Sequence, residues 1–413
     1  MNRFPLFAAA FFALIPTVSA SNTWYVDING TAPGTGTIAD PYTSIQYAAM
    51  RPATLDGDTL LVAPGTYPES LHVVTKFVSI KSIAGPELTV IKPGVPGGGV
   101  HFDGGFTNPM LDGFTVLGRV SLYDAGIHRC IIRPYDGNPG GGMFIQGSGS
   151  VTDSTITGCY MGIALDNFTG TVSLRDSILT GNTFDISATG ASHAYWSYCA
   201  GITTFNLGGN GQAALHPGLG NVSGDVGFWD PARLDFHLRP GSQCIDSGDP
   251  SSPLDPDGSP HDIGALTYDP TYAPAPSVYC TAKTNSQGCV PAIGAIGSAS
   301  ASSGTPFSIT AANELANKPG LLLLGLGKVA QPFQGGVLCV QSPIKRVGAQ
   351  ISAGAGVCGG TYSFDMAAYI VSGAHPGLVP GVLVDCQWWS RDVLDPAGFG
   401  SALSDAVSFG IAP

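Results

Sequence analysis

The sequence has few cationic side chains and almost no glutamate. Only 17 of its 413 residues are Lys or Arg, and the formal net charge is −12. Nucleic-acid binding requires basic patches that neutralise phosphate, so this composition argues against a nucleic-acid partner. Only three of the 29 acidic residues are Glu, whereas Gly and Pro number 58 and 32. Because Asp, Gly and Pro favour turns and Glu favours helices, we expect many short strands joined by turns.

Long apolar runs are absent after the N-terminus. Residues 1–20 begin with the basic tripeptide MNR, continue through a short apolar stretch and end in VSA. A basic start, a short apolar core and small residues at the end predict a secretory signal peptide. No later stretch reaches the roughly 20 apolar residues that a spanning helix needs. We therefore expect an exported protein, secreted or held at the cell surface, without a transmembrane segment.

Zinc-binding patterns are also absent, since the nine Cys and eight His form no Cys-x-x-Cys or His-x-x-x-His spacing. An exported chain meets oxidising conditions, so disulfides are expected, and the odd number leaves at least one thiol over. We expect Cys280 and Cys289 to close one loop. One further pair is expected among Cys339, Cys358 and Cys386.

A repeat occupies the middle of the chain. Four tetrapeptides align at spacings of 24, 23 and 20 residues: Arg129-Cys130-Ile131-Ile132, Asp153-Ser154-Thr155-Ile156, Asp176-Ser177-Ile178-Leu179 and Trp196-Ser197-Tyr198-Cys199. Each alternates with period two, as a half-buried strand does. A strand that recurs about every 20 residues cannot bury its face alone, but stacked coils bury a continuous core. The repeat therefore predicts a parallel β-solenoid.

The alternation also predicts the faces of these strands. The column expected to point inward consists of Ile132, Ile156, Leu179 and Cys199. The column expected to point to solvent consists of Arg129, Asp153, Asp176 and Trp196. Upstream of the repeat, Ser44 is expected to cap a short helix that covers the open first coil.

The outward column is the principal candidate site. Its simplest interpretation is an ion-pair ladder from Arg129 to Asp153 on an ordinary solvated face. Alternatively, Asp153 and Asp176, about 4.8 Å apart on adjacent coils, could act as acid and nucleophile on a glycosidic bond or share a calcium ion. Arg129 would then clamp the substrate, and Trp196 would offer a ring face for a sugar.

An Asp-rich run, CIDSGDPSSPLDPDGSPHDIGA, covers residues 244–265. Asp255 and Asp257 lie two apart before a glycine, a spacing found in calcium loops, and Asp249 and Asp262 could add ligands if the loop folds back. Asp-Pro and Asp-Gly are also ordinary turn formers. We expect this run mainly to close the solenoid, with calcium bound by these four carboxylates as the alternative.

Two stretches carry a family resemblance. The N-terminal YVDINGTAPGTGTIADPYTSIQYAAM and GDTLLVAPGTYPES resemble the start of the pectin-lyase-like right-handed parallel β-helix superfamily. The later FHLRPGSQCIDSGDP and DPDGSPHDIGA resemble the closing segment of its secreted bacterial members. The resemblance implies a right-handed parallel β-helix over residues 21–268, and it implies no single activity, because the superfamily contains lyases, hydrolases and esterases.

Catalytic patterns of that superfamily are missing. The paired Asp, Gly-His-Gly and Arg-Ile-Lys of its galacturonan hydrolases do not occur, and no Lys lies between Lys92 and Lys283. Members of the superfamily that resemble pectate lyases use Arg or Lys together with calcium held by carboxylates. The resemblance therefore supports the scaffold and weakens those two activities.

A second unit is expected after a Pro-rich linker at residues 269–277. Strand-like runs separated by Gly and Ser predict a small β-sandwich over residues 278–413. The segment resembles a C-terminal module of other secreted bacterial proteins. The expected fold class is thus all-β, a right-handed parallel β-helix followed by a small β-sandwich.

Three functional hypotheses follow from the sequence. The first is a secreted or cell-surface protein that binds polysaccharide or glycoconjugate along an exposed sheet without cleaving it. The second is a polysaccharide lyase or glycoside hydrolase that uses Asp153, Asp176 and Arg129. The third is a structural protein of the cell envelope whose second unit provides attachment. Calcium is the one cofactor that the residues suggest.

Overall fold

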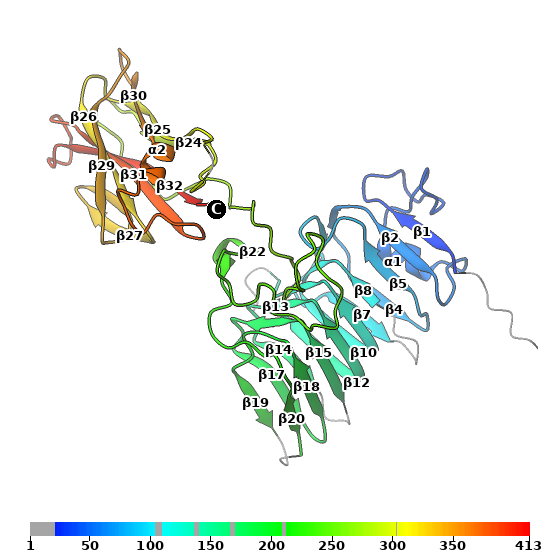
Figure 1. The fold of residues 1–413 in the computed structure, drawn as a ribbon. Coiled ribbons are helices and arrows are strands. Elements are labelled where there is room, and N and C mark those ends of the chain that lie inside the picture. Colours follow the sequence, from blue (N-terminus) through cyan, green and yellow to red (C-terminus); the bar gives the residue numbers. More distant parts are fainter. Residues whose placement is uncertain (1–20, 104–109, 136–139, 166–169, 209–211, 303) are drawn as a thin grey trace, which may run out of the picture.

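The computed structural model describes residues 21–413 except 104–109, 136–139, 166–169, 209–211 and 303. Strands make up 47% of the chain and helices 4%, which confirms the all-β class. A parallel β-solenoid of about six turns comes first, and antiparallel sheets follow it (Figure 1). Within the described residues, no helix is both long and apolar enough to cross a membrane.

The solenoid has three faces, which we name A, B and C, and neighbouring strands of each face belong to successive coils. Face A contains β4 (Leu71–Val74), β7 (Gly99–Asp103), β14 (Met161–Leu165), β17 (Phe184–Thr189), β19 (Phe205–Gly208) and the first parts of β10 (Arg119–His128) and β12 (Gly142–Thr152). Face B contains β1 (Thr23–Val26), β2 (Thr59–Val62), β5 (Ser79–Ser82), β8 (Met110–Asp112), β15 (Thr171–Arg175), β18 (His193–Ser197), β20 (Ala214–Pro217) and the second parts of β10 and β12. Because β10 and β12 run through both faces, faces A and B form one 14-stranded sheet.

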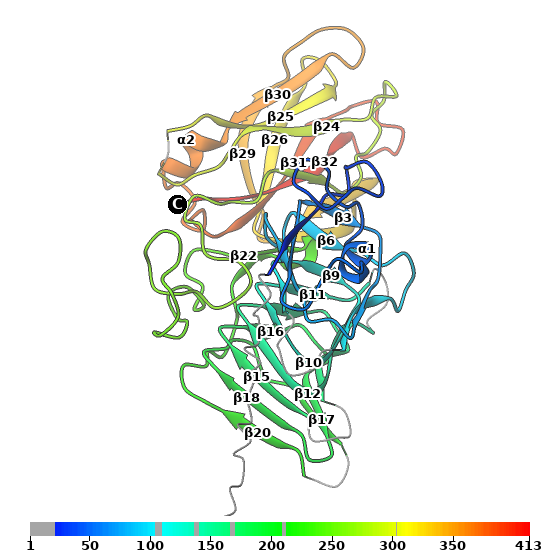
Figure 2. The ribbon, with the colours of Figure 1, turned by 90° about the vertical axis from the view of Figure 1, so that its right-hand side faces the viewer.

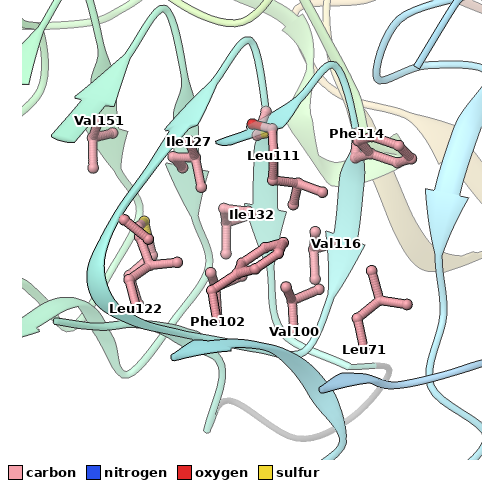
Figure 3. Packing of buried hydrophobic residues seen from close by; sticks show 14 of the residues in the cluster. Leu71, Val100, Phe102, Leu111, Phe114, Val116, Leu122, Ile127, Ile132 and Val151 are labelled. Atoms are coloured by element: carbon pink, nitrogen blue, oxygen red, sulfur yellow. The ribbon is translucent and has the colours of Figure 1, made fainter. Parts of the chain in front are cut away.

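Face C is a separate six-stranded sheet, visible as a row of short strands in Figure 2. It contains β3 (Gly65–Tyr67), β6 (Thr89–Ile91), β9 (Thr115–Leu117), β11 (Ile131–Arg133), β13 (Thr155–Thr157) and β16 (Ile178–Thr180). The predicted inward residues Ile132, Ile156 and Leu179 are fully buried on this face. They face the aliphatic and aromatic side chains of the other faces, among them Phe102 and Leu122 in Figure 3.

In five successive coils, a residue with positive φ lies at the corner where the chain leaves face B for face C. These corner residues are Gly113, Arg129, Asp153, Asp176 and Tyr198, with φ between 47° and 80°. The left-handed region is populated mainly by Gly, Asn and Asp, because a short polar side chain can hydrogen-bond locally there. This backbone requirement explains why two of the five positions are Asp. We call the five residues the corner column.

The prediction that Arg129, Asp153, Asp176 and Trp196 form one solvent-facing column is wrong in two respects. Trp196 pairs in register with Leu174 and is 7% exposed in the core, and Tyr198 takes the place in the column above Asp176. A shift of two residues preserves the period-two pattern, so alternation alone did not detect the misalignment. Asp176 is fully buried, because strand alternation does not apply to a corner residue.

The same shift moves Cys199 to another column. Cys199 follows the corner residue directly, as Cys130, Ser154 and Ser177 do. The Ser154 hydroxyl accepts from the Cys130 amide at 3.2 Å, and the Ser177 hydroxyl accepts from the Ser154 amide at the same distance. The hydroxyls of Ser154 and Ser177 therefore satisfy backbone amides at the preceding corners.

The N-terminal end of the solenoid is covered by α1 (Ile45–Met50). Ser44 is its N-cap and accepts a hydrogen bond from the Tyr47 amide at 3.0 Å, as predicted. Ile45, Ala48 and Ala49 of this helix are fully buried against the first coils. The helix therefore closes the end of the core that the first coil would leave open.

The segment after the last coil covers the outer side of face C. It contains the hairpin of β21 (Phe228–Asp230) and β22 (Asp235–Leu238), joined by the short helix η1 (Pro231–Arg233), and then the Asp-rich run. Phe236 and Ile263 belong to one buried cluster with Ile131 and Ile178, which point outward from face C. The hairpin and the Asp-rich run therefore cover much of the outer side of face C.

Antiparallel sheets form the second unit. The five-stranded sheet contains, in order, β23 (Ser277–Tyr279), β32 (Ser401–Gly410), β31 (Leu383–Arg391), β26 (Pro319–Gly325) and β29 (Lys345–Ile351). The three-stranded sheet contains β24 (Ala292–Gly297), β25 (Phe307–Glu314) and β30 (Gly360–Asp365), and the remaining elements are the hairpin of β27 (Lys328–Phe333) and β28 (Gly336–Val340) and the helix α2 (Met366–Val371). Trp388 is fully buried in their common core and stacks on Tyr362.

Two disulfides join Cys280 to Cys339 and Cys289 to Cys358. The predicted local pair of Cys280 and Cys289 is wrong, because the two cysteines are cross-linked to distant segments 59 and 69 residues away. Cys386 remains a buried free thiol. The disulfide pairing does not follow the shortest separation along the chain, because the fold brings cysteines that are remote in the sequence into contact.

Candidate functional site

Four of the predicted site residues, Arg129, Asp153, Asp176 and Asp255, belong to a largely buried network that attaches the Asp-rich run to the solenoid. The network joins corner residues to side chains of the run and of the neighbouring strands. We call it the corner network, and its members are Asp112, His128, Arg129, Asp153, Asp176, Asp255 and His261.

Carboxylates and imidazoles alternate along this network. His128 contacts Asp112 through Nδ1 at 3.0 Å and Asp153 through Nε2 at 2.7 Å. His261 contacts the other oxygen of Asp153 through Nε2 at 2.9 Å and Asp255 through Nδ1 at 3.1 Å. Each imidazole thus bridges two acids, and one acid, Asp153, lies between the two imidazoles.

The expected pairing of Arg129 with Asp153 is replaced by another. Both Nε and Nη2 of Arg129 donate to Asp112, at 2.9 and 2.8 Å. The Arg129 side chain thus reaches Asp112, which lies 17 residues earlier on β8 of the preceding coil. The imidazole of His128, one residue earlier on β10, reaches Asp153 instead.

Asp176 is closed off by the Asp-rich run. Its Oδ1 accepts from the amide of Asp249 at 2.7 Å, and its Oδ2 accepts from the hydroxyl of Ser252 at 2.8 Å. Its backbone carbonyl accepts from the amide of Gly264 at 2.9 Å. A carboxylate that is fully buried and has hydrogen bonds on both oxygens cannot reach a sugar chain from solvent.

The four carboxylates predicted to bind calcium do not form one ligand set. Asp257 and Asp249 accept hydrogen bonds from the serines two residues later, and Asp262 accepts from the amides of Asp246 and Tyr268. They stabilise turns of their own loop, which is the ordinary role of Asp in such turns. Among the described residues, the group whose oxygen and nitrogen atoms come within 4.8 Å of one another is Asp153, Asp176 and His261.

The alternation of carboxylates and imidazoles stabilises the charged forms of Asp153 and His128 in the corner network. Burial opposes ionisation of Asp153, but hydrogen bonds from His128 and His261 outweigh it and hold the pKa of Asp153 below its ordinary value. Burial likewise opposes protonation of His128, but bonds to Asp112 and Asp153 raise its pKa to about 9. Burial, together with the nearby charge of Asp262, raises the pKa of Asp255 to about 6. At neutral pH a charged His128 therefore lies between two charged carboxylates.

This arrangement is better suited to holding the Asp-rich run against the solenoid than to catalysis. Both ring nitrogens of His128 contact carboxylates. Nε2 of His261 contacts Asp153, and its Nδ1 lies 3.1 Å from Asp255 but is buried and has no hydrogen-bond partner within the described residues. Neither imidazole therefore presents a nitrogen at an accessible surface, where it could take a proton from a substrate. The two histidines were not among the predicted site residues. His128 precedes a corner residue and His261 lies in the Asp-rich run, so their only sequence signal was this adjacency.

An open groove lies elsewhere, on face A and beside α1. One hollow of about 350 Å³ is lined by residues that include His72, His101, Arg119 and Ser121. A second of about 480 Å³ is lined by residues of α1 and its surroundings, including Tyr47 and Arg51. Ser70 lines both hollows, so they adjoin. We call the two together the face-A groove.

Strand register builds one wall of this groove. His72, His101, Ser121 and Phe144 occupy equivalent outward positions on β4, β7, β10 and β12. The imidazole rings of His72 and His101 have centroids 4.9 Å apart. The guanidinium of Arg119 lies 3.5 Å from the centroid of the Phe144 ring, a cation–π contact that orients it while leaving it exposed.

A glycine lets the strands approach at the end of the groove. Gly99 pairs with Arg119, and a Cβ atom on Gly99 would lie 1.8 Å from the Arg119 carbonyl oxygen. Only a residue without a side chain fits this close to the neighbouring strand, and Gly99 is itself one of the lining residues of the hollow. Burial, with the neighbouring His72 as a second cause, lowers the pKa of His101, which is therefore neutral at pH 7.

The groove offers binding groups and lacks a pair of free carboxylates. It presents the cations Arg51 and Arg119, imidazole and hydroxyl groups, and the partly exposed ring of Tyr47. Glu69 is the one carboxylate among its described lining residues, and its oxygens accept from the Ser44 hydroxyl and from the amides of Ile45 and Gln46. Such a surface can bind an elongated, hydroxyl-rich anion.

Comparison of the chain with protein-family models, with curated proteins and with solved structures found no match. A function for this protein therefore has to be inferred from its own residues, the corner network and the face-A groove.

Proposed function

We propose that this protein is an extracellular carbohydrate-binding protein that holds an acidic polysaccharide in the face-A groove and does not cleave it. Its scaffold would be a β-helix of the pectin-lyase-like type, as the two sequence stretches suggest. The observation that carries the proposal is the pair of adjoining hollows on face A, with Arg51 in one and Arg119 in the other.

The polymer class follows from local charge. The chain as a whole carries a formal charge of −12, so an anionic polymer would be repelled from most of its surface. The groove concentrates two arginines, and its one lining carboxylate is engaged at the N-terminus of α1. Arg pairs well with carboxylate and sulfate oxygens because its planar guanidinium donates two parallel hydrogen bonds.

The weakness of the enzymatic alternative supports binding without cleavage. Hydrolysis with the predicted residues would require Asp153 and Asp176 to flank a sugar at an accessible surface. Asp176 is fully buried, and both oxygens of Asp153 contact imidazoles. An extracellular location is supported by the signal-like residues 1–20 and by the two disulfides.

Isothermal titration calorimetry of the full chain with a long oligogalacturonate measures the affinity and tests the proposal. Arg119→Gln should weaken binding by about tenfold or more, because a charge-assisted hydrogen bond contributes about 1.5–3 kcal/mol. Lys81→Gln, which removes the same charge from face B, is the matched control and should bind as the wild type does. Equal affinities of all three proteins, or unsaturated or shortened products after incubation, would contradict the proposal.

A further inference from the structure

The outer surface of the five-stranded sheet is only partly covered. The β27–β28 hairpin is anchored over Gln387, whose Oε1 accepts from the Cys339 amide at 3.0 Å and whose Nε2 donates to the Val337 carbonyl at 2.9 Å. Two residues farther along β31, Trp389 lies on the same side of the sheet, beside the turn of the hairpin. A cavity of about 270 Å³ opens there, lined by Leu321, Leu323, Phe333, Gln334, Arg346 and Trp389.

The walls of this cavity come from four strands and a turn. Leu321 lies directly opposite Trp389, and Leu323 lies opposite Arg346, so their side chains share the outer side of the sheet. The intervening Leu322 lies opposite Trp388, and both are fully buried on the inner side. Alternation along β26 and β31 therefore divides the two adjacent tryptophans, one to the core and one to the cavity.

The cavity is held in shape before any ligand enters. The indole Nε1 of Trp389 donates to Oε1 of Gln334 at 2.8 Å, which fixes the ring against the hairpin turn. Gln334 and Gly335 both have positive φ, at 47° and 73°, as a tight two-residue hairpin turn requires. The backbone carbonyl of Gln334 also accepts from Lys283 at 2.7 Å, and Lys283 in turn is paired with Asp395. A preformed site binds with a smaller loss of conformational entropy.

The lining combines apolar surfaces with one cation. Trp389, Leu321 and Phe333 are only partly buried, so they present ring and aliphatic surface to the cavity. Arg346 is exposed at the edge strand β29 and has no salt-bridge partner within the described residues. A purely apolar occupant would use the rings and leucines and leave this guanidinium without a function. A ligand with one apolar face and one carboxylate would use both.

We propose that this cavity is a second carbohydrate site, which binds a single uronic-acid residue with its C–H face on Trp389 and its carboxylate on Arg346. The choice of a uronic acid rests on the proposed function, since both sites would then bind the same polymer. The cavity volume of about 270 Å³ lies just below the range of roughly 300–1,000 Å³ for small-molecule pockets, which favours a single sugar ring over a longer chain. Two sites on one chain would raise the avidity for long polymers above that for short ones.

The test titrates trigalacturonate into the full-length protein, with cellotriose as the neutral probe. Arg346→Gln should weaken the site by about tenfold or more, and Trp389→Phe should keep the fold while it weakens stacking. Lys345→Gln is the control, because the preceding residue on β29 directs the same charge to the other side of the strand. In ¹H–¹⁵N spectra, the indole resonance of Trp389, assigned through its loss in Trp389→Phe, should shift with trigalacturonate and stay unchanged with cellotriose.

The two proposals fail in different ways. Loss of the Trp389 indole shift in Arg346→Gln, with the shift retained in Arg119→Gln, supports the second site whatever happens in the face-A groove. An indole resonance that trigalacturonate does not move in the wild type overturns the second site, even if Arg119→Gln shows that the groove binds. An equal shift with cellotriose overturns the assignment of a uronic acid, since Arg346 would then select nothing.

Discussion

Replacing His128 with Gln should loosen the Asp-rich run from the solenoid, and the loss should depend on pH. Gln is similar in size to His and can still hydrogen-bond, but it carries no charge. In the wild type, the charged imidazole lies 3.0 Å from Asp112 and 2.7 Å from Asp153. In the variant those two acids and Asp255 have only Arg129 and His261 as cationic neighbours in the corner network.

The magnitude follows from the pKa. Bonds to Asp112 and Asp153 overcome burial and raise the pKa of His128 from 6.5 to about 9. A displacement of that size corresponds to about 3 kcal/mol, at ~1.4 kcal/mol for each tenfold change in proton affinity. Because 30% of the imidazole is exposed, solvent screening reduces the expected contribution to about 1–2 kcal/mol.

The sign follows from proton linkage. A histidine whose pKa is raised by folding stabilises the folded state fully below its unfolded pKa, near 6.5. That contribution is lost as the pH rises through the folded value, near 9. The wild type should therefore exceed His128→Gln in free energy of unfolding at pH 6, and the difference should vanish near pH 10. Burial lowers the pKa of His261, but the hydrogen bond to Asp153 and the nearby acid charges outweigh it and leave that pKa raised. The variant should therefore retain a weaker pH dependence of the same sign.

Urea unfolding followed by far-UV circular dichroism at pH 6, 8 and 10 measures these differences. Hydrogen exchange at one fixed pH adds a local readout, since the amides of Asp249 and Gly264 bond to Asp176 and should lose protection in the variant. His72→Gln, at an exposed position of face A, is the control and should leave both measurements unchanged. A constant difference between wild type and His128→Gln across the pH range would refute the proposed role of the imidazole charge.

Two further changes test the second unit. Burial raises the pKa of Glu314 from 4.5 to about 7, its Oε1 has no hydrogen-bond partner within the described residues, and Ser390 donates to its other oxygen at 2.8 Å. When folding raises the pKa of an acid, the protein loses stability as the pH rises through the folded pKa. Glu314→Gln should therefore be more stable than the wild type by up to about 3 kcal/mol at pH 8.5 and equal to it near pH 4, as measured by thermal melting. A variant that is less stable at both pH values would contradict this prediction. Replacing Cys289 and Cys358 together with Ser should cost about 2–4 kcal/mol, because the disulfide closes a loop of 69 residues in the unfolded chain. Reduction of the wild type opens both disulfides and should cost at least as much. An unchanged melting temperature in the double variant would refute the prediction.

Some features of the fold could be predicted because they depend on local pattern. Ser44 caps α1 as expected, since an N-cap hydroxyl acts within three residues of the chain. Ile132, Ile156 and Leu179 are buried as expected, because period-two alternation and a repeat of similar length on each coil define one inward column. The turns of the Asp-rich run use Asp249 and Asp257 to cap their own backbone, as its turn-forming residues predict, but the run covers the side of face C and was expected to close the end of the solenoid.

Other features depend on register, which local pattern does not contain. Alternation predicts that Trp196 points to solvent, because a shift of two residues leaves the pattern unchanged, whereas the pairing of Trp196 with Leu174 places it in the core. The partners of Cys280 and Cys289 lie 59 and 69 residues away and could not be deduced from spacing. His261 meets Asp153 across 108 residues, a contact for which the sequence carries no mark.

The amino-acid sequence by itself determined that this chain winds into a stacked all-β solenoid followed by a second β unit, because composition, periodicity and turn residues act over short distances. The tertiary structure alone decided which acids became buried partners of histidines and which surface stayed open. In the sequence, Asp153 and Asp176 look like ordinary turn aspartates. In the structure, the Asp-rich run returns to them, and its residues hydrogen-bond to both carboxylates. Long-range contacts of that kind depend on how coils and loops pack together. They leave the carboxylates of the corner column covered and the polar side chains of the face-A groove accessible.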